Sequence, residues 1–244
     1  MRQTVVAAFS FLAFCLPAGF SQTYTGIRAP APSLTEPVVN QPYSAELVAD
    51  TVQVLADGTR VTRTLPNLRL YRDSAGRTRT DGPILTNPDT GKEKVVMVVI
   101  VDPVAGFQYV LDLRQRIAHR RPLEAPAPPA ANSAAEPAQP ERPQRTVEPM
   151  GSQWIEGVSS EGTRVTMGLA AAAPDAAPQV LSRTEYWLSP DLQVMVLRRQ
   201  IDPQGGEFRN RLIHILRAEP DLRLFQPPSD YRMVDETSAF GIQP

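Results

Sequence analysis

The chain has 244 residues, of which 42% are hydrophobic, so it is long enough to bury a substantial core as one large domain or two small ones. Its net charge of -1 gives no reason to expect nucleic acid or an anionic membrane surface as a partner. Arginine outnumbers lysine 23 to 2. Such a bias arises from selection for bidentate anion binding or from a GC-rich coding sequence, and the second source is the commoner one.

The first 21 residues have the pattern of a secretory signal peptide. Arg2 is followed by a twelve-residue apolar run, residues 5–16, which is shorter than the roughly 20 residues that a membrane-spanning helix needs. Small residues come next, and cleavage is predicted between Ser21 and Gln22. The mature protein is therefore expected to be exported, periplasmic or extracellular, and to have no transmembrane segment.

The single cysteine, Cys15, lies inside this segment and is removed with it. Lipid attachment requires a small residue before the cysteine, whereas Phe14 stands there, so we expect no acylation. The mature chain then has no thiolate nucleophile, no CxxC redox site, no thiolate zinc site and no disulfide. Packing alone is left to stabilise the fold.

Two segments rich in proline and small residues predict little regular structure. Residues 22–42 are expected to form an extended N-terminal tether. Residues 122–149 contain 8 prolines and 7 alanines in 28 positions, and such a composition cannot bury enough apolar surface to offset the entropy of ordering it. We predict a disordered linker between a first half of a β domain, residues 43–121, and a second half, residues 150–236, with a C-terminal tail at 237–244.

Residues 43–121 predict a series of antiparallel hairpins. Two β-prone stretches meet at Asp57 and Gly58, a dipeptide suited to a tight hairpin turn, and further turns are predicted at residues 73–76 and 102–106. Residues 95–101 form an unbroken apolar run. The strand after the third turn alternates with period two, which places on one side the apolar residues Phe107, Tyr109, Leu111 and Leu113.

The second half repeats this pattern. The pentapeptide GTRVT at residues 58–62 recurs at 162–166, each time after an acidic residue, so a hairpin turn followed by a returning strand is predicted at both places. Further turns are predicted at residues 189–191 and 202–206, and a single helical turn at 219–225. GTRVT repeats at an offset of 104 and the Asp-Pro turns at an offset of 100, so duplication and convergence on hairpin-forming residues both stay open.

About eleven strands and almost no helix are predicted in all. An open sheet of more than roughly ten twisted strands tends to curl or split. The predicted fold class is therefore mainly β: one large curved antiparallel sheet or half-open barrel, with a disordered Pro/Ala-rich insertion. Such a sheet encloses a hollow, and the candidate lining residues are the aromatic side chains Tyr109, Trp154, Trp187 and Phe208.

The chain offers few groups for catalysis. Its two histidines, His119 and His214, have no partner at metal-ligand spacing, and no GxSxG motif is present. We therefore predict no catalytic residue, no metal site and no cofactor.

Most carboxylates have a local role in the predicted fold. Five aspartates lie at predicted turns, where Asp accepts backbone hydrogen bonds: Asp57, Asp73, Asp102, Asp191 and Asp202. Three glutamates lie within predicted strands: Glu156, Glu185 and Glu207. They are interpreted as part of a solvated sheet face, and the alternative is an acid/base pair across a cleft.

The C-terminal half carries a resemblance to known proteins. A Trp-containing strand start is followed by Ser-Pro-Asp-Leu at residues 189–192, Asp-Pro-x-x-Gly-Glu at 202–207, Glu-Pro-Asp at 219–221 and Phe-x-x-Pro-x-Asp-Tyr at 225–231. This series resembles a group of uncharacterised secreted bacterial β-rich proteins. More distantly, the order of strands and turns is similar to the periplasmic carriers of outer-membrane lipoprotein sorting (LolA/LolB-like), whose half-open barrel holds acyl chains. The Pro-rich insertion and the lack of inner helices depart from the carriers.

Two functions are therefore expected from the sequence. The first is a non-enzymatic envelope protein that binds a lipid or lipoprotein acyl chain in the hollow, where about 14 methylenes at about 0.8 kcal/mol each would contribute roughly 11 kcal/mol. The second is an envelope scaffolding module whose sheet edges or Pro-rich loop bind another envelope protein. An enzyme ranks third.

Overall fold

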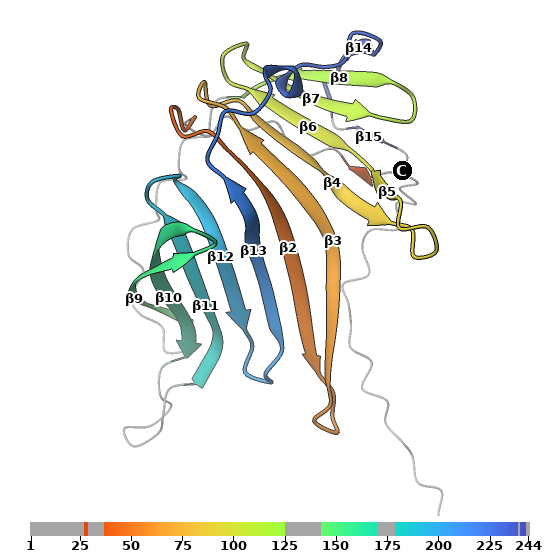
Figure 1. The fold of residues 1–244 in the computed structure, drawn as a ribbon. Coiled ribbons are helices and arrows are strands. Elements are labelled where there is room, and N and C mark those ends of the chain that lie inside the picture. Colours follow the sequence, from red (N-terminus) through yellow and green to blue (C-terminus); the bar gives the residue numbers. More distant parts are fainter. Residues whose placement is uncertain (1–26, 29–36, 125–142, 170–178, 239, 243–244) are drawn as a thin grey trace, which may run out of the picture.

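The computed structural model describes residues 27–28, 37–124, 143–169, 179–238 and 240–242 (Figure 1). The predicted signal peptide and most of the predicted linker lie outside these residues. Within them the regular structure is almost entirely β, with one 3-10 helix, η1 (Leu222–Phe225). This helix confirms the helical turn predicted at 219–225.

Thirteen strands form one sheet and two short strands form a separate pair. The sheet order is β14-β8-β7-β6-β4-β3-β2-β13-β12-β11-β10-β9, with β5 paired to β4, and its pairs are antiparallel except that β14 runs parallel to β8. The strands are β1 (Ile27–Arg28), β2 (Tyr43–Val54), β3 (Arg60–Arg72), β4 (Thr78–Thr86), β5 (Glu93–Val95), β6 (Val98–Asp102), β7 (Phe107–Asp112), β8 (Ile117–Pro122), β9 (Gln144–Ile155), β10 (Val158–Leu169), β11 (Gln179–Ser189), β12 (Val194–Ile201), β13 (Glu207–Leu216), β14 (Arg232–Asp235) and β15 (Gly241–Ile242).

The sheet does not close into a barrel, because β9 and β14 are its two ends and are not paired with each other. The predicted fold class, a large curved β-sheet, is thus confirmed, with thirteen strands in place of about eleven. The two additional features that the sequence did not indicate are the short parallel strand β14 and the extension of β9 into the Pro-rich region.

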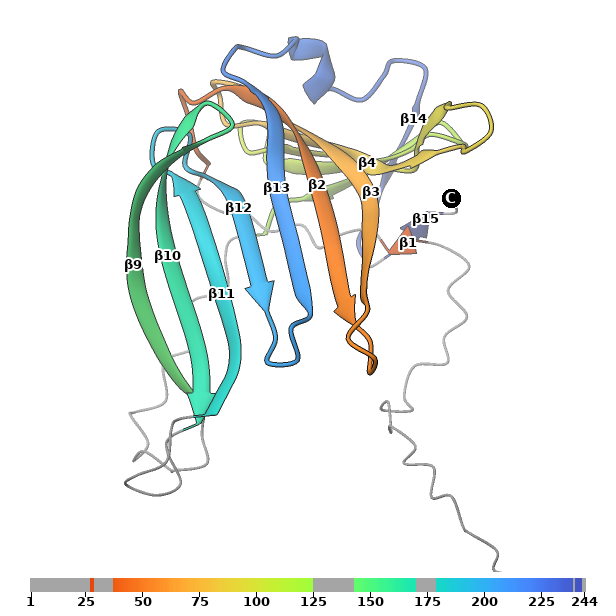
Figure 2. The ribbon, with the colours of Figure 1, turned by 60° about the horizontal axis from the view of Figure 1, so that its bottom comes forward.

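One hydrogen bond shows which way the sheet bends. Arg72, at the end of β3, donates from Nη2 to the backbone carbonyl oxygen of Leu192, in the turn between β11 and β12. Three strand spacings separate β3 from β12, which is about 14 Å in a flat sheet and beyond the reach of one arginine side chain. The sheet therefore curves toward the face that carries Arg72 (Figure 2). We call this the concave face and the opposite one the convex face.

Three clusters of buried apolar side chains hold the sheet together. The first lies at one end of the strands, where Tyr43, Ala45 and Leu212 of the concave face pack with Val158, Leu192 and Val196. The second lies on the convex face of β6, β7 and β8, where Phe225 of η1 packs on Val98, Ile100, Leu111 and Ala118. The third covers the other face of the same strands and pairs Val110 with Ile242. The β6–β8 region is thus buried on both faces.

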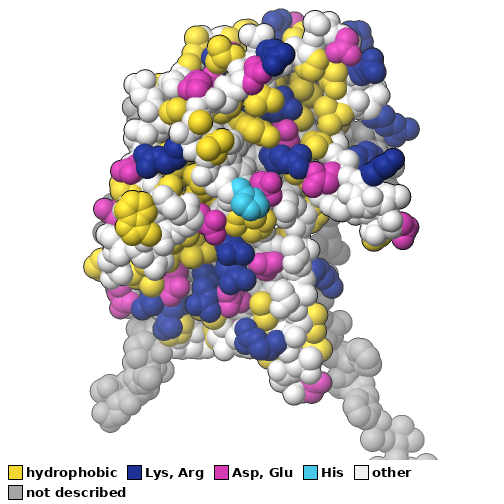
Figure 3. Space-filling view, in the orientation of Figure 1, with side chains coloured by type: hydrophobic (Ala, Val, Ile, Leu, Met, Phe, Trp, Pro, Cys, Tyr) yellow, Lys and Arg dark blue, Asp and Glu magenta, His cyan; other side chains and the backbone are white. Residues whose placement is uncertain are grey.

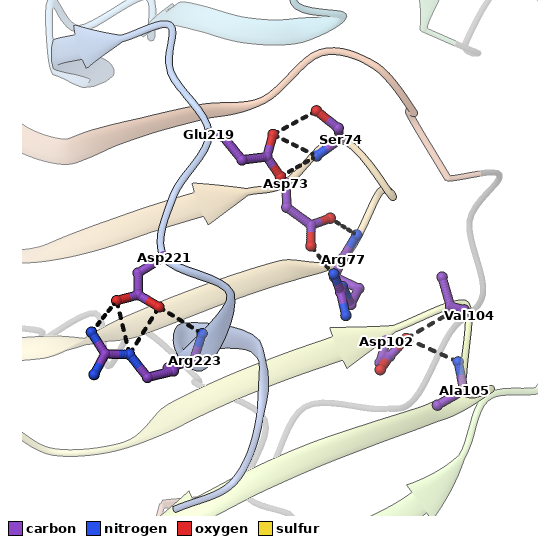
Figure 4. Close-up of polar contacts among 9 residues, drawn as sticks. All are labelled: Asp73, Ser74, Arg77, Asp102, Val104, Ala105, Glu219, Asp221 and Arg223. Atoms are coloured by element: carbon purple, nitrogen blue, oxygen red, sulfur yellow. Dashed lines mark hydrogen bonds and ion pairs between the residues drawn. The ribbon is translucent and has the colours of Figure 1, made fainter.

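Carboxylates fix several turns and attach the C-terminal segment to the sheet (Figure 4). Asp73 is fully buried and accepts from the backbone N–H of Arg77 at 2.9 Å and from its Nε at 2.6 Å. Glu219 accepts from the hydroxyl of Ser74 at 2.5 Å, and Asp221 accepts from the backbone N–H of Arg223 at the start of η1. These bonds hold the segment before η1 against the β3–β4 turn.

The predicted turn role is confirmed for four of the five aspartates. The side chains of Asp57, Asp73, Asp102 and Asp202 accept backbone hydrogen bonds in the turns that they begin. The bond from the Thr59 N–H lowers the pKa of Asp57 below its ordinary value of 3.8. Asp191 lies in the β11–β12 turn, and its carboxylate is 3.5 Å from the guanidinium of Arg217.

The turn predicted at the second GTRVT copy is wrong. β10 runs unbroken through Gly162, and the hairpin turn lies earlier, at Glu156 and Gly157, where φ is 48° and 77°. Glu156 is therefore a turn residue and not a strand residue. Gly162 serves packing instead, since a Cβ there would lie 2.7 Å from the ring of Trp187. The first copy does follow a turn, with φ of 83° at Gly58.

Two predicted boundaries also change. The linker predicted to end at residue 149 ends earlier, because β9 begins at Gln144 and pairs with β10 from that residue on. The C-terminal tail, expected without structure, contains β15, which pairs with β1. Ile242 of β15 is only 2% exposed. In both places pairing to a neighbouring strand orders residues whose own sequence gives little sign of it.

Candidate functional site

The concave face of the strands from β9 to β3 carries two adjacent rows of side chains, each with one residue per strand. The cross-strand register fixes both rows, because residues directly opposite one another point to the same face. The first row is Pro149, Thr163, Tyr186, Arg198, Asn210, Ala49 and Leu65. The second row is Val147, Val165, Thr184, Gln200, Phe208, Thr51 and Arg63.

This part of the sheet is a single layer. In the part of the chain that the structure describes, β9 to β13 contact mainly their neighbours in the sheet, and η1 lies over β4 and β6 instead (Figure 2). Val165, Tyr186 and Phe208 are nonetheless partly buried by the curvature of the sheet. A hollow of about 360 Å³ opens at the β12–β13 hairpin, where Gln200 and Phe208 of the second row line it together with Val52, Glu207 and the turn residues Asp202 and Gly206. Its size suits part of a small ligand.

The convex face of the same strands carries charges of both signs that pair with one another. Figure 3 views this side, where Lys/Arg and Asp/Glu side chains interleave over the lower part of the sheet. The row next to the first concave row reads Glu148, Arg164, Glu185, Arg199, Arg209 and Asp50. Its contacts include Arg164–Glu185 at 3.1 Å and Arg209–Asp50 at 3.3 Å, while Arg199 binds Glu207 at 2.9 Å.

The hydrogen bond from Arg199 lowers the pKa of Glu207 below its ordinary value of 4.5 and raises that of the arginine. Glu185 and Glu207, two of the three glutamates considered for an acid/base pair, both contact this one arginine, at 3.9 Å and 2.9 Å. Their geometry is that of a charge ladder across a sheet face, which agrees with the predicted solvated face.

The two concave rows contain no Asp or Glu, although they contain Arg63 and Arg198. Arg198 lies between two aromatic rings, with its guanidinium carbon 5.9 Å from the ring centroids of both Tyr186 and Phe208. Its Nη2 donates to the side-chain oxygen of Gln200 at 2.7 Å. Arg198 forms no ion pair within the described residues, so its positive charge is not compensated there.

Two buried polar atoms near this arginine lack a hydrogen-bond partner among the described residues: Arg198 Nε and Asn210 Oδ1. The two residues are opposite each other in the first row. Buried polar groups in folded proteins are nearly always satisfied, so an unpaired donor and acceptor side by side indicate a place where a further group fits. The arrangement can bind a planar anion or another acceptor without any covalent chemistry.

The structure brings one of the four predicted lining residues, Phe208, into this site. Tyr109 lies on the convex face. The register places it on the same face as Ile100, Arg79, Tyr71 and Ser44 in successive strands, and Ser44 points away from its neighbour Tyr43, which shares the concave face with Arg72. On the convex face Tyr109 joins the second buried cluster, and burial raises its pKa above the ordinary value.

The two tryptophans lie away from the concave rows. Trp187 pairs with Leu197 on the convex face, and its side chain is buried over Gly162. Trp154, near the end of β9, is 75% exposed. The predicted set is therefore spread over both faces and one edge of the sheet.

Sequence reasoning missed Arg198 and Asn210. The signal available was the pair Arg198-Arg199 in one strand: adjacent strand residues point to opposite faces, so only one of them can join a charge ladder. The side of the sheet that would be concave could not be deduced, because it depends on the contact between Arg72 and Leu192, 120 residues apart.

Neither histidine lies beside a nucleophile or a metal-ligand partner among the described residues. His214, in β13, is exposed, with Nδ1 3.8 Å from Glu46. His119 contacts Glu236 at 2.7 Å and stacks on Phe240. No group of three or more His, Cys, Asp or Glu in the described ranges could hold a metal ion. Among the described elements there is also no helix with the length and apolar character needed to cross a membrane.

A further hollow of about 410 Å³ lies on the convex side, between the bulge in β3 and the β4–β5 hairpin. It is lined by polar and apolar groups in about equal measure, and two of its residues, Arg69 and Glu93, form an ion pair with each other. Its charged groups are thus already paired within the protein, in contrast to Arg198.

The sequence matches no protein-family model and no curated protein. Among solved structures, the chain is similar to an uncharacterised conserved protein from Thermus thermophilus, with 10% identity, a TM-score of 0.40, and coverage of 80% of this chain and 91% of that one. A LolA superfamily protein from Nitrosomonas europaea is 6% identical over 78% and 92%, with a TM-score of 0.29. The Mycobacterium tuberculosis lipoprotein LppX is 12% identical over 73% and 88%, with a TM-score of 0.29. A LolA superfamily protein, the kind of carrier named from the sequence, is thus among the similar solved structures, and no property of these proteins is assigned to this chain.

Proposed function

We propose that the chain is an exported, non-enzymatic envelope protein that binds a lipid, or the acyl chain of a lipoprotein, on its concave face. The observation that supports this most is the single-layer concave surface, on which apolar and aromatic side chains are only partly buried. Val165, Tyr186 and Phe208 have no described layer packed above them. Burial of an acyl chain over such a surface removes apolar area of both molecules from water.

The energetics suit this ligand. About 14 methylenes at about 0.8 kcal/mol each give roughly 11 kcal/mol, against a cost of several kcal/mol for lost freedom on binding. The balance is compatible with micromolar or tighter binding. A curved sheet lined by mixed apolar and polar side chains can hold the chain and leave its polar end near hydrogen-bonding groups.

Native mass spectrometry of the protein purified from its own envelope tests the proposal. The expected result is a co-purifying lipid mass on the wild-type chain, reduced in Phe208→Ser. Ile201→Ser is the matched control, because Ile201 is also partly buried and lies on the convex face next to the concave second row. A bare wild-type chain, or equal loss of lipid in both variants, would contradict binding on the concave face.

A scaffolding role is the second candidate, and one observation favours it. β9 is a twelve-residue strand that, among the described strands, pairs only with β10, so no described strand covers its outer edge. Trp154 and Val147 on this strand are 75% and 48% exposed. An open edge of this kind accepts an added strand from another protein. A photo-crosslinker at Trp154 and at Val147 should then capture the same envelope protein, whereas one at Arg209 should not.

A further inference from the structure

We infer that the ligand of the concave face carries an anionic group, a carboxylate or a phosphate, and that Arg198 binds this group. The inference rests on the proposed function, since it takes the concave face as a lipid-binding surface and adds the chemistry of the ligand's polar end. It assigns Arg198 as the residue that determines specificity for an anionic amphiphile.

The first support is the distribution of charge between the faces. Arg198 and Arg199 are adjacent in β12 and therefore point to opposite faces. Arg199 contacts two carboxylates, Glu185 and Glu207, on the convex face. Arg198 faces two rows without a single acidic side chain, so the concave face around it attracts an anion. The acidic residues next to these rows point to the convex side: Glu148, Glu185, Glu207 and Asp50.

The second support is the immediate setting of the guanidinium. The rings of Tyr186 and Phe208 lie at equal distances of 5.9 Å from its guanidinium carbon, and among the described residues Nη2 alone has a hydrogen-bond partner, the side chain of Gln200. Guanidinium donors form a rigid planar fork that matches carboxylate and phosphate oxygens. Nε and the opposite oxygen of Asn210 are both buried without partners among the described residues. A carboxylate or phosphate oxygen accepts from guanidinium donors, and a protonated phosphate or glycerol hydroxyl can donate to the amide oxygen.

A purely structural arginine in this protein looks different. Arg72, on the same concave face, is 5% exposed, donates to the carbonyl oxygens of Gln41 and Leu192 and stacks on Tyr43. Its donors are thus used to join distant strands. Arg198 joins no other strand through a hydrogen bond among the described residues, since Gln200 belongs to its own strand. Its Nη1 is not used by a described residue, whereas its buried Nε becomes accessible to a ligand only when neighbouring side chains move.

The third support is the apolar surface on both sides of Arg198. Ala49 and Leu65 continue the first row on one side, and Val165 lies in the second row on the other. An anionic group bound at Arg198 therefore has apolar surface next to it in both directions along the rows. This pattern fits an amphiphile and does not fit a small soluble anion such as inorganic phosphate.

The test uses the full mature chain after lipid removal and three ligands of equal chain length: hexadecanoate, hexadecyl phosphate and methyl hexadecanoate. Affinities are measured by native mass spectrometry titration for wild type, Arg198→Gln and the matched control Arg199→Gln. We expect wild type to bind at least one anionic ligand about tenfold or more tightly than the methyl ester, because a charge-assisted hydrogen bond is worth more than a neutral one. The tighter of the two anions identifies the headgroup.

In Arg198→Gln this preference should fall to near parity while methyl hexadecanoate still binds, and in Arg199→Gln it should persist. Thermal melts of both variants show that each is folded. A wild-type protein that binds the ester as tightly as both anions, or a preference that survives in Arg198→Gln, would overturn the inference and leave lipid binding intact. Failure of folded wild type to bind any of the three ligands would overturn the proposed function itself.

Discussion

Two regions of the sheet are built in different ways. The strands β6, β7 and β8 are buried on both faces, by Phe225 of η1 on one side and Ile242 on the other, and each of these side chains is at most 2% exposed. From β9 to β13 the first cluster buries one end of the strands, including Val158, Val196 and Leu212, whereas no described layer covers the part that carries the two concave rows. There the sequence sorts side chains by face, with paired charges on the convex side and unpaired polar and aromatic groups on the concave side. Packing holds the first region, and the second is free to bind.

The largest effect should come from breaking the covered region. Phe225→Ala removes a ring that is 1% exposed in the second cluster, and we expect a loss of about 3–5 kcal/mol in the free energy of unfolding. Phe208→Ala is the matched change in the open region and should cost clearly less, because Phe208 is only partly buried. Denaturant unfolding of both variants measures the difference. Equal losses would show that the open face is packed as tightly as the covered one.

A second, smaller effect concerns Gly162, which begins the second GTRVT copy and packs against Trp187 instead of forming a turn. Gly162→Ala would place a Cβ 2.7 Å from the ring of Trp187, and overpacking of this kind costs typically about 1–3 kcal/mol. Trp187→Leu in the same chain should recover part of that loss. A double-mutant cycle of thermal unfolding measures the coupling between the two sites. Additive losses would contradict the contact.

The smallest effect sharpens the comparison between the two faces of the open region. Because Arg199 lowers the pKa of Glu207, this carboxylate stabilises the fold above pH 4.5, its ordinary pKa, and the contribution is lost as pH falls from there through the lowered folded-state pKa. Glu207→Gln should therefore reduce acid destabilisation below pH 4.5 by at most about 1 kcal/mol, as for other partly exposed pairs.

The control for this experiment is Glu148→Gln. Glu148 is the outermost member of the same ladder, 56% exposed and 3.8 Å from Arg164, so its replacement removes a weaker contact and should change stability less than Glu207→Gln does. Stability is measured by urea unfolding at a series of pH values. If the stability of both variants changed equally with pH, the Arg199–Glu207 ion pair would not contribute as predicted.

Local structure could be predicted from the sequence where a single residue type determines it. Asp57, Asp73 and Asp102 marked turns because Asp side chains cap backbone N–H groups two to four residues on, and these turns formed where predicted. Gly162 was misread because glycine also serves where a large ring packs on the backbone, and the partner ring belongs to another strand. Sequence alone does not separate these two uses.

Only part of the candidate site could be predicted from the sequence. Phe208 could be proposed from its aromatic character, but Tyr109 and Trp187 were equally aromatic and lie on the convex face. Alternation shows which residues share a face, and it does not show which face is concave. The first part of β9, up to Pro149, was predicted as linker, since its polar residues and Pro149 hide a strand that pairing with β10 stabilises.

The central claim is that a lipid lies on the concave face, and paramagnetic broadening tests it most directly. A fatty acid with a nitroxide on its chain is added to methyl-labelled protein, and methyl signals are compared between faces. We expect the strongest broadening at Val165, Thr184 and Thr51 on the concave face and clearly weaker broadening at Thr166 and Ile201 on the convex face, because the effect falls steeply with distance although it reaches through a single sheet layer. Broadening confined to the convex methyls, or equal intensities on both faces at saturating ligand, would contradict the account.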